Sequence, residues 1–265
     1  MTIDKMPKSG KEREDWIFDQ VWDGFSDFSF TEIRSTYNNH TAIFNVFADA
    51  LRISGVRVSV SAETEQKIAD ITGCSLLTPK LADLIWMQRS IHIPPFPHAV
   101  DASSDMTSNQ WSLDHSKHID EEISKSGSIG VISTVGKHWV IDNDLSKITN
   151  KAMNYGWHFV GPNFQGIRGD VTASLLMDEK GTYTRLIQGR GTRHDMHHTD
   201  YSQTCVLVSR SCLVDGVESD LFDILSNPEL APLASHQGMM SVFRQPGVPG
   251  TSGKLVLPRI VITGD

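Results

Sequence analysis

Cysteine, positive charge and long apolar runs are all in short supply in this chain of 265 residues. Its three cysteines, Cys74, Cys205 and Cys212, are odd in number and form no CxxC pair, which argues against a disulfide framework. No stretch approaches the roughly 18 consecutive apolar residues of a membrane helix, and residues 1–15 lack the apolar segment of a secretory signal peptide. We therefore expect a cytoplasmic protein with reduced thiols and no membrane partner.

Basic residues are outnumbered, because 24 Lys and Arg face 32 Asp and Glu, for a net charge of −8. Nucleic-acid phosphates demand a surplus of basic side chains, so this balance argues against a nucleic-acid partner. The chain also lacks a GxSxG elbow, a GxxxxGKS/T loop, a GxGxxG turn after a strand and an HExxH helix. The familiar signatures of serine hydrolases and nucleotide-binding proteins are therefore missing, and we expect no nucleotide cofactor.

Hydrophobic periodicity divides the chain into two parts of different character. The first part carries one alternating run, over 56–60, and helical apolar spacing over 16–25, 41–51, 61–70, 78–88 and 106–125. After Gly127 come a short helical segment, over 221–226, and β-like runs, among them 129–132, 138–141, 152–160, 182–187 and 204–214. The sequence thus predicts an α+β fold, with a helical N-terminal half packed on a mostly antiparallel, β-rich C-terminal half. We expect a flexible tail over 1–15 and a single domain over 16–265.

Histidine is what the chain has in quantity, with 11 residues. Three of them, His194, His197 and His198, lie within a window of five residues and are followed by Asp200. Imidazole and carboxylate groups together are the usual ligands of zinc, which keeps one position open for water at catalytic sites. A solvated loop with incidental histidines is the alternative for this cluster. The preceding arginines, Arg185, Arg190 and Arg193, could recruit a carboxylate-bearing substrate or lie in an ordinary solvated loop.

Two further segments contain candidate histidines. His158 ends the aromatic segment 155–158, where it is either a ligand or a hydrogen-bonded core residue. Gly156, between two aromatic residues, indicates a bulge or a close approach of another group to the backbone. His115 and His118 share one face of the predicted helix over 106–125 and could hold a metal or lie on a half-exposed surface.

Several motifs together resemble a family of uncharacterised, mainly bacterial proteins of about this size. They are Leu-Thr-Pro-Lys-Leu-x-Asp-Leu-Ile-Trp at 77–86, His115, Tyr-Gly-Trp-His at 155–158, and His194 six residues before Asp200-Tyr201-Ser202. The resemblance spans about 56–238, which favours one domain, and it implies candidate positions rather than a reaction. In the family pattern a histidine follows Asp-Tyr-Ser, whereas this chain has Gln203, which keeps hydrogen bonding but loses proton transfer near neutral pH.

A looser similarity links the ligand types to those of zinc D-alanyl-D-alanine peptidases. Those enzymes use a histidine, an aspartate a few residues later and a Trp-His pair, which correspond in type to His194, Asp200 and Trp157-His158. Here the Trp-His pair comes first in the chain, and the glutamate that usually precedes it is missing. The general base would therefore come from elsewhere.

Three functional hypotheses follow from these residues. The first is a hydrolase that cleaves an amide bond in a small peptide or cell-wall-type fragment, with His158, His194 and Asp200 as zinc ligands. His115, His197 and His198 are alternative ligands, His115 is also a candidate general base, and Tyr201 or Arg193 would stabilise the oxyanion.

The second hypothesis is a metal-free hydrolase in which His194 or His158 is the base, Asp200 orients it, and Ser202 or Cys205 is the nucleophile. The third is a non-catalytic binding or structural protein, whose aromatic and histidine residues form a recognition surface. Convergence of His158, His194 and Asp200 on one pocket would favour the enzymes, whereas a wide separation of the three would count against both of them. The substrate beyond a small molecule or peptide, and the oligomeric state, stay open.

Overall fold

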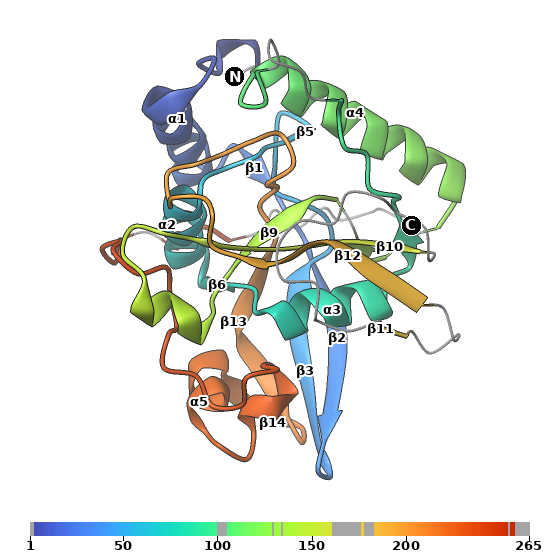
Figure 1. Ribbon diagram of the computed structural model, residues 1–265, viewed down its shortest axis with the longest axis vertical. Coiled ribbons are helices and arrows are strands. Elements are labelled where there is room, and N and C mark those ends of the chain that lie inside the picture. The colour runs from blue at the N-terminus through green and yellow to red at the C-terminus, as the bar shows by residue number, and fades with distance from the viewer. Residues whose placement is uncertain are drawn as a thin grey trace.

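Helices and mostly antiparallel strands alternate along the chain and form an α+β fold (Figure 1). The computed structural model describes residues 3–99, 105–128, 130–133, 135–160, 176–177, 183–253 and 255–257. Within these ranges the α-helices are α1 (Gly10–Trp22), α2 (Ala62–Thr72), α3 (Pro79–Met87), α4 (Asn109–Ser126) and α5 (Leu221–Ser226). Short 3-10 helices cover Ile3–Lys5, Asn143–Lys147 and Ala231–Leu233.

Two sheets carry the longer strands. The hairpin sheet has the order β14-β13-β3-β2, and β6 also pairs with β13. Its strands are β2 (Phe30–Tyr37), β3 (His40–Phe47), β6 (Cys74–Leu76), β13 (Leu207–Val214) and β14 (Val217–Asp220). The site sheet has the order β11-β12-β10-β9, built from β9 (Lys137–Val140), β10 (Met153–Val160), β11 (Leu176–Met177) and β12 (Tyr183–Gly191).

Two small sheets complete the described strands. The antiparallel set β1-β4-β5 consists of β1 (Ser26–Asp27), β4 (Arg52–Ile53) and β5 (Val56–Arg57). The parallel pair consists of β7 (Ile91–His92) and β8 (Ile132–Ser133).

The predicted division into a helical N-terminal half and a β-rich C-terminal half is not clearly seen, because strands β1 to β7 are interspersed with α1 to α4. The prediction of a helix over 41–51 is wrong, since most of this segment belongs to β3. Its β-branched residues Thr41, Ile43 and Val46 suit a strand, and β3 lies between β2 and β13, which both supply backbone partners. A short run with apolar residues on both faces resembles a helix in its periodicity.

Local capping explains why other predicted helices are confirmed. Ser61 accepts a hydrogen bond from the backbone N–H of Thr64 and begins α2, which ends at Gly73 in the left-handed conformation, with φ 67°. Thr78 accepts from the N–H of Leu81, and Pro79 stands at the first turn of α3. The short helix predicted over 221–226 is α5, capped by Asp220.

The first helix, α1, begins at Gly10, inside the segment 1–15 that was predicted as a flexible tail. It buries Arg13 and Ile17, and Met6 packs against the main core. Part of the predicted tail therefore contributes to the packed structure.

Two hydrophobic cores take side chains from the site sheet. The large core contains Trp139 and Tyr155, together with most buried residues of the hairpin sheet. A smaller core contains Trp157, Phe159, Ile187 and Tyr201, with Trp111 of α4 packed against it. Strand β10 contributes Tyr155 to the large core and Trp157 and Phe159 to the smaller one.

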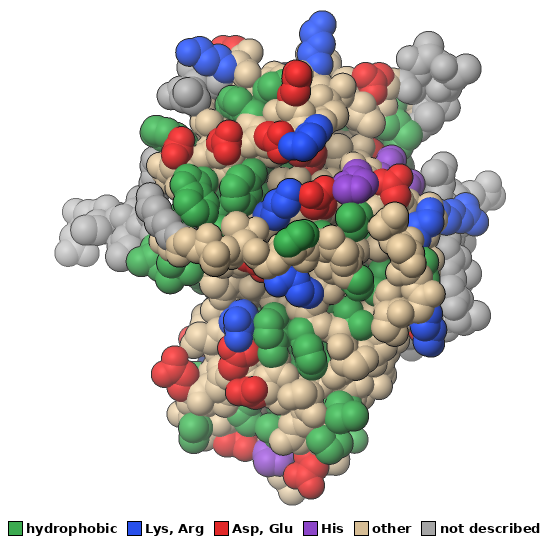
Figure 2. Space-filling view, turned by 90° about the vertical axis from the view of Figure 1, so that its left-hand side faces the viewer, with side chains coloured by type: hydrophobic (Ala, Val, Ile, Leu, Met, Phe, Trp, Pro, Cys, Tyr) green, Lys and Arg blue, Asp and Glu red, His purple; other side chains and the backbone are tan. Residues whose placement is uncertain are grey.

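Figure 2 shows the side of the molecule that carries α1, α2 and α5, where basic, acidic and hydrophobic side chains are interspersed. In the part of the chain that the structure describes, no helix has the length and apolar character needed to cross a bilayer.

Candidate functional site

Strand β10 changes its side-chain alternation at Gly156 and Trp157. Both residues have positive φ, 114° and 59°, and the pairing with β12 shifts register between Asn154 and Gly156. Tyr155 and His158, three residues apart, consequently point to the same side. A Cβ at Gly156 would lie 3.1 Å from His138 Cδ2, so the predicted bulge and close approach are both confirmed.

On the other side of this strand lies a cavity of about 260 Å³, which we call the His194 pocket. Its polar lining comes from β9, β10, β12 and the segment 193–200, through Lys137, Asn154, Gln188, Arg193, His194, His198 and Asp200. Met106, which also packs against the smaller core, lines it too. Four predicted site residues, Arg193, His194, His198 and Asp200, therefore share one cavity.

Asp200 is the fixed negative charge of the His194 pocket. Its Oδ2 atom lies 3.1 Å from Lys137 Nζ, and its Oδ1 accepts from the Ser202 N–H at 2.9 Å and hydroxyl at 2.5 Å. Burial by itself would raise the pKa of Asp200, but the Lys137 ammonium and the hydrogen bonds outweigh it and hold that pKa well below its usual range. Asp200 is therefore ionised at neutral pH.

His194 is a neutral proton acceptor in the same pocket. Burial, followed by the charges of His198 and Lys137, lowers the pKa of His194 to about 4. Its ring lies parallel to that of His198, with centroids 3.9 Å apart and planes 8° apart. His198 Nε2 lies 3.7 Å from Asp200 Oδ2, beyond hydrogen-bond distance.

Asn154 supplies an unsatisfied amide to the pocket wall. The residue is 1% exposed, and neither its Oδ1 nor its Nδ2 has a hydrogen-bond partner. Leaving a buried polar group unpaired costs about 1–3 kcal/mol, so such groups usually meet a ligand or water. An amide with a free donor and a free acceptor is complementary to another amide.

His158 belongs to a different cluster, around the buried carboxylate of Asp83 in α3. Asp83 Oδ1 accepts from Tyr155 Oη and His158 Nε2, both at 2.8 Å, and Oδ2 accepts from His236 Nε2 at 2.7 Å. Burial would raise the pKa of Asp83, but the bonds from His158 and His236 prevail and lower it. His158 also stacks on Trp86 and does not line the His194 pocket, so the predicted zinc ligands His158, His194 and Asp200 do not share one pocket.

The remaining predicted residues are distributed between the smaller core and the surface. His115 is buried, donates from Nε2 to the Val135 carbonyl at 2.8 Å, and has its pKa lowered to about 4 by burial. Tyr201 packs beside the His115 ring, and its hydroxyl accepts from the His98 N–H at 2.8 Å. His197 is exposed and binds Glu63 Oε2 at 2.6 Å.

The predicted nucleophiles do not line the His194 pocket. The Ser202 hydroxyl is buried against Asp200, and Cys205 is fully buried, where burial raises the pKa of its thiol far above the ordinary value. Gln203 accepts from the Asp200 N–H at 2.7 Å and so helps to hold this turn.

The geometry of possible metal ligands bears on the zinc prediction. Among the described residues, no group of three or more His, Cys, Asp and Glu side chains is arranged to hold a metal ion. In-plane lone pairs of two parallel stacked rings run side by side rather than toward a common point, and Asp200 Oδ2 is engaged by Lys137. Metal binding by His194, His198 and Asp200 would require both the ring stacking and the contact between Asp200 and Lys137 to change.

Sequence reasoning missed Lys137, Asn154, Asp83 and His236 as site residues. Asp83 had a detectable signal, because it is the only charged residue within the apolar stretch 81–86. Lys137 and Asn154 had none, since their importance depends on pairing between β9 and β10. Of the preceding arginines, Arg193 lines the pocket and Arg190 binds Asp142, whereas the side chain of Arg185 lies outside the described residues.

Comparison with protein-family models, with curated proteins and with solved structures found no match to this chain. The resemblance seen in the sequence motifs stays a prediction.

Proposed function

We propose that the protein is a hydrolase that cleaves an amide bond of a small polar molecule or short peptide in the His194 pocket. The observation that carries this proposal is the unpaired carboxamide of Asn154 in the same cavity as the neutral imidazole of His194. The first group would orient a substrate amide, and the second would accept a proton.

The proposed reaction is direct attack by water. His194 removes a proton from water as the oxygen bonds to the carbonyl carbon, which gives a tetrahedral oxyanion and a protonated imidazole. His194 then returns the proton to the leaving nitrogen as the C–N bond breaks, so the products are a carboxylic acid and an amine. No enzyme nucleophile is needed, which agrees with the buried positions of Ser202 and Cys205.

Lys137 is the proposed stabiliser of the oxyanion. Its ammonium has three N–H donors, and the contact with Asp200 at 3.1 Å holds it at the pocket wall while occupying one of them. Arg193, on the same cavity, is the second cation available to a developing negative charge or to a substrate carboxylate.

A metal-assisted form of the same reaction is the second candidate. It is favoured by one observation, namely that His194, His198 and Asp200 line one cavity. Zinc binding would be tested by elemental analysis of the purified protein and by activity before and after dialysis against a chelator. Equal activity without bound zinc would support the metal-free form.

The decisive experiment compares His194→Asn with His197→Asn on a panel of acetylated amino-acid amides and dipeptides. Hydrolysis is followed by mass spectrometry in ¹⁸O-labelled water, where one labelled oxygen in the carboxylate product identifies hydrolysis of the amide. We expect His194→Asn to lose at least about 100-fold in rate, a typical general-base contribution. The control removes an exposed histidine paired with Glu63 and should retain full activity.

Two results would contradict the proposal. Equal turnover by His194→Asn and the wild type would remove His194 from catalysis. Binding of amides without any turnover, abolished by Asn154→Ala, would instead support the recognition-protein hypothesis.

A further inference from the structure

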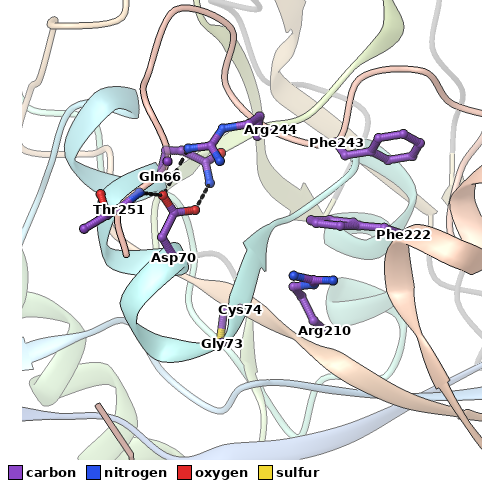
Figure 3. Close-up of a pocket in the computed structure, with 10 residues that line it drawn as sticks. Gln66, Asp70, Gly73, Cys74, Arg210, Phe222, Phe243, Arg244 and Thr251 are labelled. Carbon is purple, nitrogen blue, oxygen red and sulfur yellow. Dashed lines mark hydrogen bonds and ion pairs between the residues drawn. The ribbon is translucent and has the colours of Figure 1, made fainter. Parts of the chain in front are cut away.

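A second cavity, of about 240 Å³, lies between α2, α5, the start of β6 and the segment that follows residue 240 (Figure 3). We call it the Arg244 pocket. The residues used below are Asp70, Cys74, Arg210, Phe222, Phe243 and Arg244, which all line it. It shares no lining residue with the His194 pocket, and the proposed hydrolysis makes no use of it.

Arg244 is held in place at one wall of this pocket. Its Nη2 donates to Asp70 Oδ2 at 3.0 Å and to the Pro249 carbonyl at 3.2 Å. Asp70 is fixed in turn by the Gln66 amide at 3.0 Å and the Thr251 N–H at 2.8 Å, as the dashed lines in Figure 3 show. The guanidinium is therefore preorganised, which reduces the entropy lost when it binds a ligand.

Aromatic rings and a second arginine form the opposite wall. Phe222 of α5 and Phe243 pack with ring centroids 5.5 Å apart, and the Arg210 guanidinium lies 4.4 Å over the Phe222 ring. Arg210 also donates to Asp220 Oδ2 at 2.6 Å. In Figure 3, Arg210, Phe222 and Phe243 lie on one side and Arg244 and Asp70 on the other.

The charges and the volume narrow the class of ligand. Two arginines line the cavity, and each is paired with one aspartate, Arg244 with Asp70 and Arg210 with Asp220, so the site has no large surplus of positive charge. Burial raises the pKa of the Cys74 thiol to about 12, so this residue adds a neutral, weakly polar surface. The volume is below the roughly 300–1,000 Å³ of sites for drug-sized ligands, which indicates a compound with one ring.

We propose that the Arg244 pocket binds a small monocarboxylate that carries a planar apolar ring. The carboxylate would accept hydrogen bonds from Arg244, beside the open backbone of Gly250, where an added Cβ would lie 3.4 Å from Arg244 Nη1. The ring would pack against Phe222 and Phe243. Because each arginine already has one carboxylate partner, a single negative charge fits better than a dianion such as phosphate.

The test is isothermal titration of the full-length protein with benzoate, benzamide and inorganic phosphate. We expect benzoate to bind with a dissociation constant on the order of 1 mM, a reasonable value for nine non-hydrogen atoms, and the other two probes to bind at least tenfold more weakly. Arg244→Gln should weaken benzoate binding by at least tenfold. Arg210→Lys, which keeps the charge but loses the planar group, should weaken it several-fold.

Arg193→Gln is the matched control, because it removes a cation from the His194 pocket and should leave benzoate affinity unchanged. If Arg244→Gln does not fold, Gly250→Val is the substitute test. Its side chain would block Arg244 without removing the charge, and it should weaken benzoate binding. The proposal is overturned if the wild type does not bind benzoate, if benzamide binds equally well, or if only Arg193→Gln abolishes binding.

Discussion

Lys137 places its Nζ atom 3.1 Å from Asp200 Oδ2 at the wall of the His194 pocket, where the two side chains are only 11% and 2% exposed. The pair joins β9 to the segment after β12 and supplies the pocket with one fixed charge of each sign. Its burial makes both the stability and the proposed chemistry of the site sensitive to loss of either partner.

Asp200→Asn should destabilise the protein by about 3 kcal/mol at pH 7, because Lys137 would keep a buried charge without its counter-ion. The pKa of Asp200 is lowered in the folded state, so its contribution is present above the unfolded value near 4 and is lost as pH falls below it. The difference between wild type and variant, measured by urea unfolding, should therefore shrink from pH 6 toward pH 3. A constant difference would argue against the charge interaction.

The proposed hydrolysis should depend on the protonation of His194. Because burial lowers the pKa of this residue to about 4, it is active as a base at neutral pH and becomes protonated in acid. The kcat/KM value should therefore be flat above about pH 5 and fall roughly tenfold per unit below pH 4. An activity that instead falls near pH 6.5 would assign the proton transfer to an ordinary, exposed histidine.

Glu65→Gln should stabilise the protein at alkaline pH. Glu65 is fully buried, and burial raises its pKa well above the ordinary value, so the folded state holds a proton that the unfolded state releases. The wild type therefore loses stability as pH rises above the unfolded value near 4. We expect the variant to gain on the order of 1 kcal/mol at pH 8, and much less at pH 4.5, in unfolding experiments.

Tyr155→Phe tests the cluster around Asp83. The Tyr155 hydroxyl donates to the buried carboxylate at 2.8 Å, and loss of a hydrogen bond to a charged group costs about 1.5–3 kcal/mol. Tyr37→Phe, at the exposed end of β2, is the matched control and should change the unfolding free energy by less than about 0.5 kcal/mol. Equal effects of the two substitutions would contradict a structural role for the Asp83 cluster.

Gly156→Ala tests the change of alternation in β10. The added Cβ would meet His138 Cδ2 at 3.1 Å on a backbone with φ 114°, so both contact and strain oppose it. Gly216→Ala, at φ 82° with nothing within 4 Å, introduces strain alone. We expect at least about 2 kcal/mol of destabilisation for the first and about 1 kcal/mol for the second, by thermal unfolding.

Features that depend on neighbours a few residues away could be predicted from residue order. Ser61 and Thr78 begin α2 and α3 through bonds to N–H groups three residues further on, and such caps can be predicted from residue order. The proximity of His194 to Asp200 was similarly predictable, because only a short segment separates them.

The strand at 40–47 and the partners of the buried charges could not be predicted in this way, because they depend on which distant segments pack together. The apolar segment around Phe44 could have been a helix, and it is a strand because β2 and β13 bind its two edges. Asp83 is far from His158 along the chain, as Lys137 is from Asp200, and only packing brings each pair together. A buried charge pairs with the group that the fold places beside it, and the local sequence does not show which group that is.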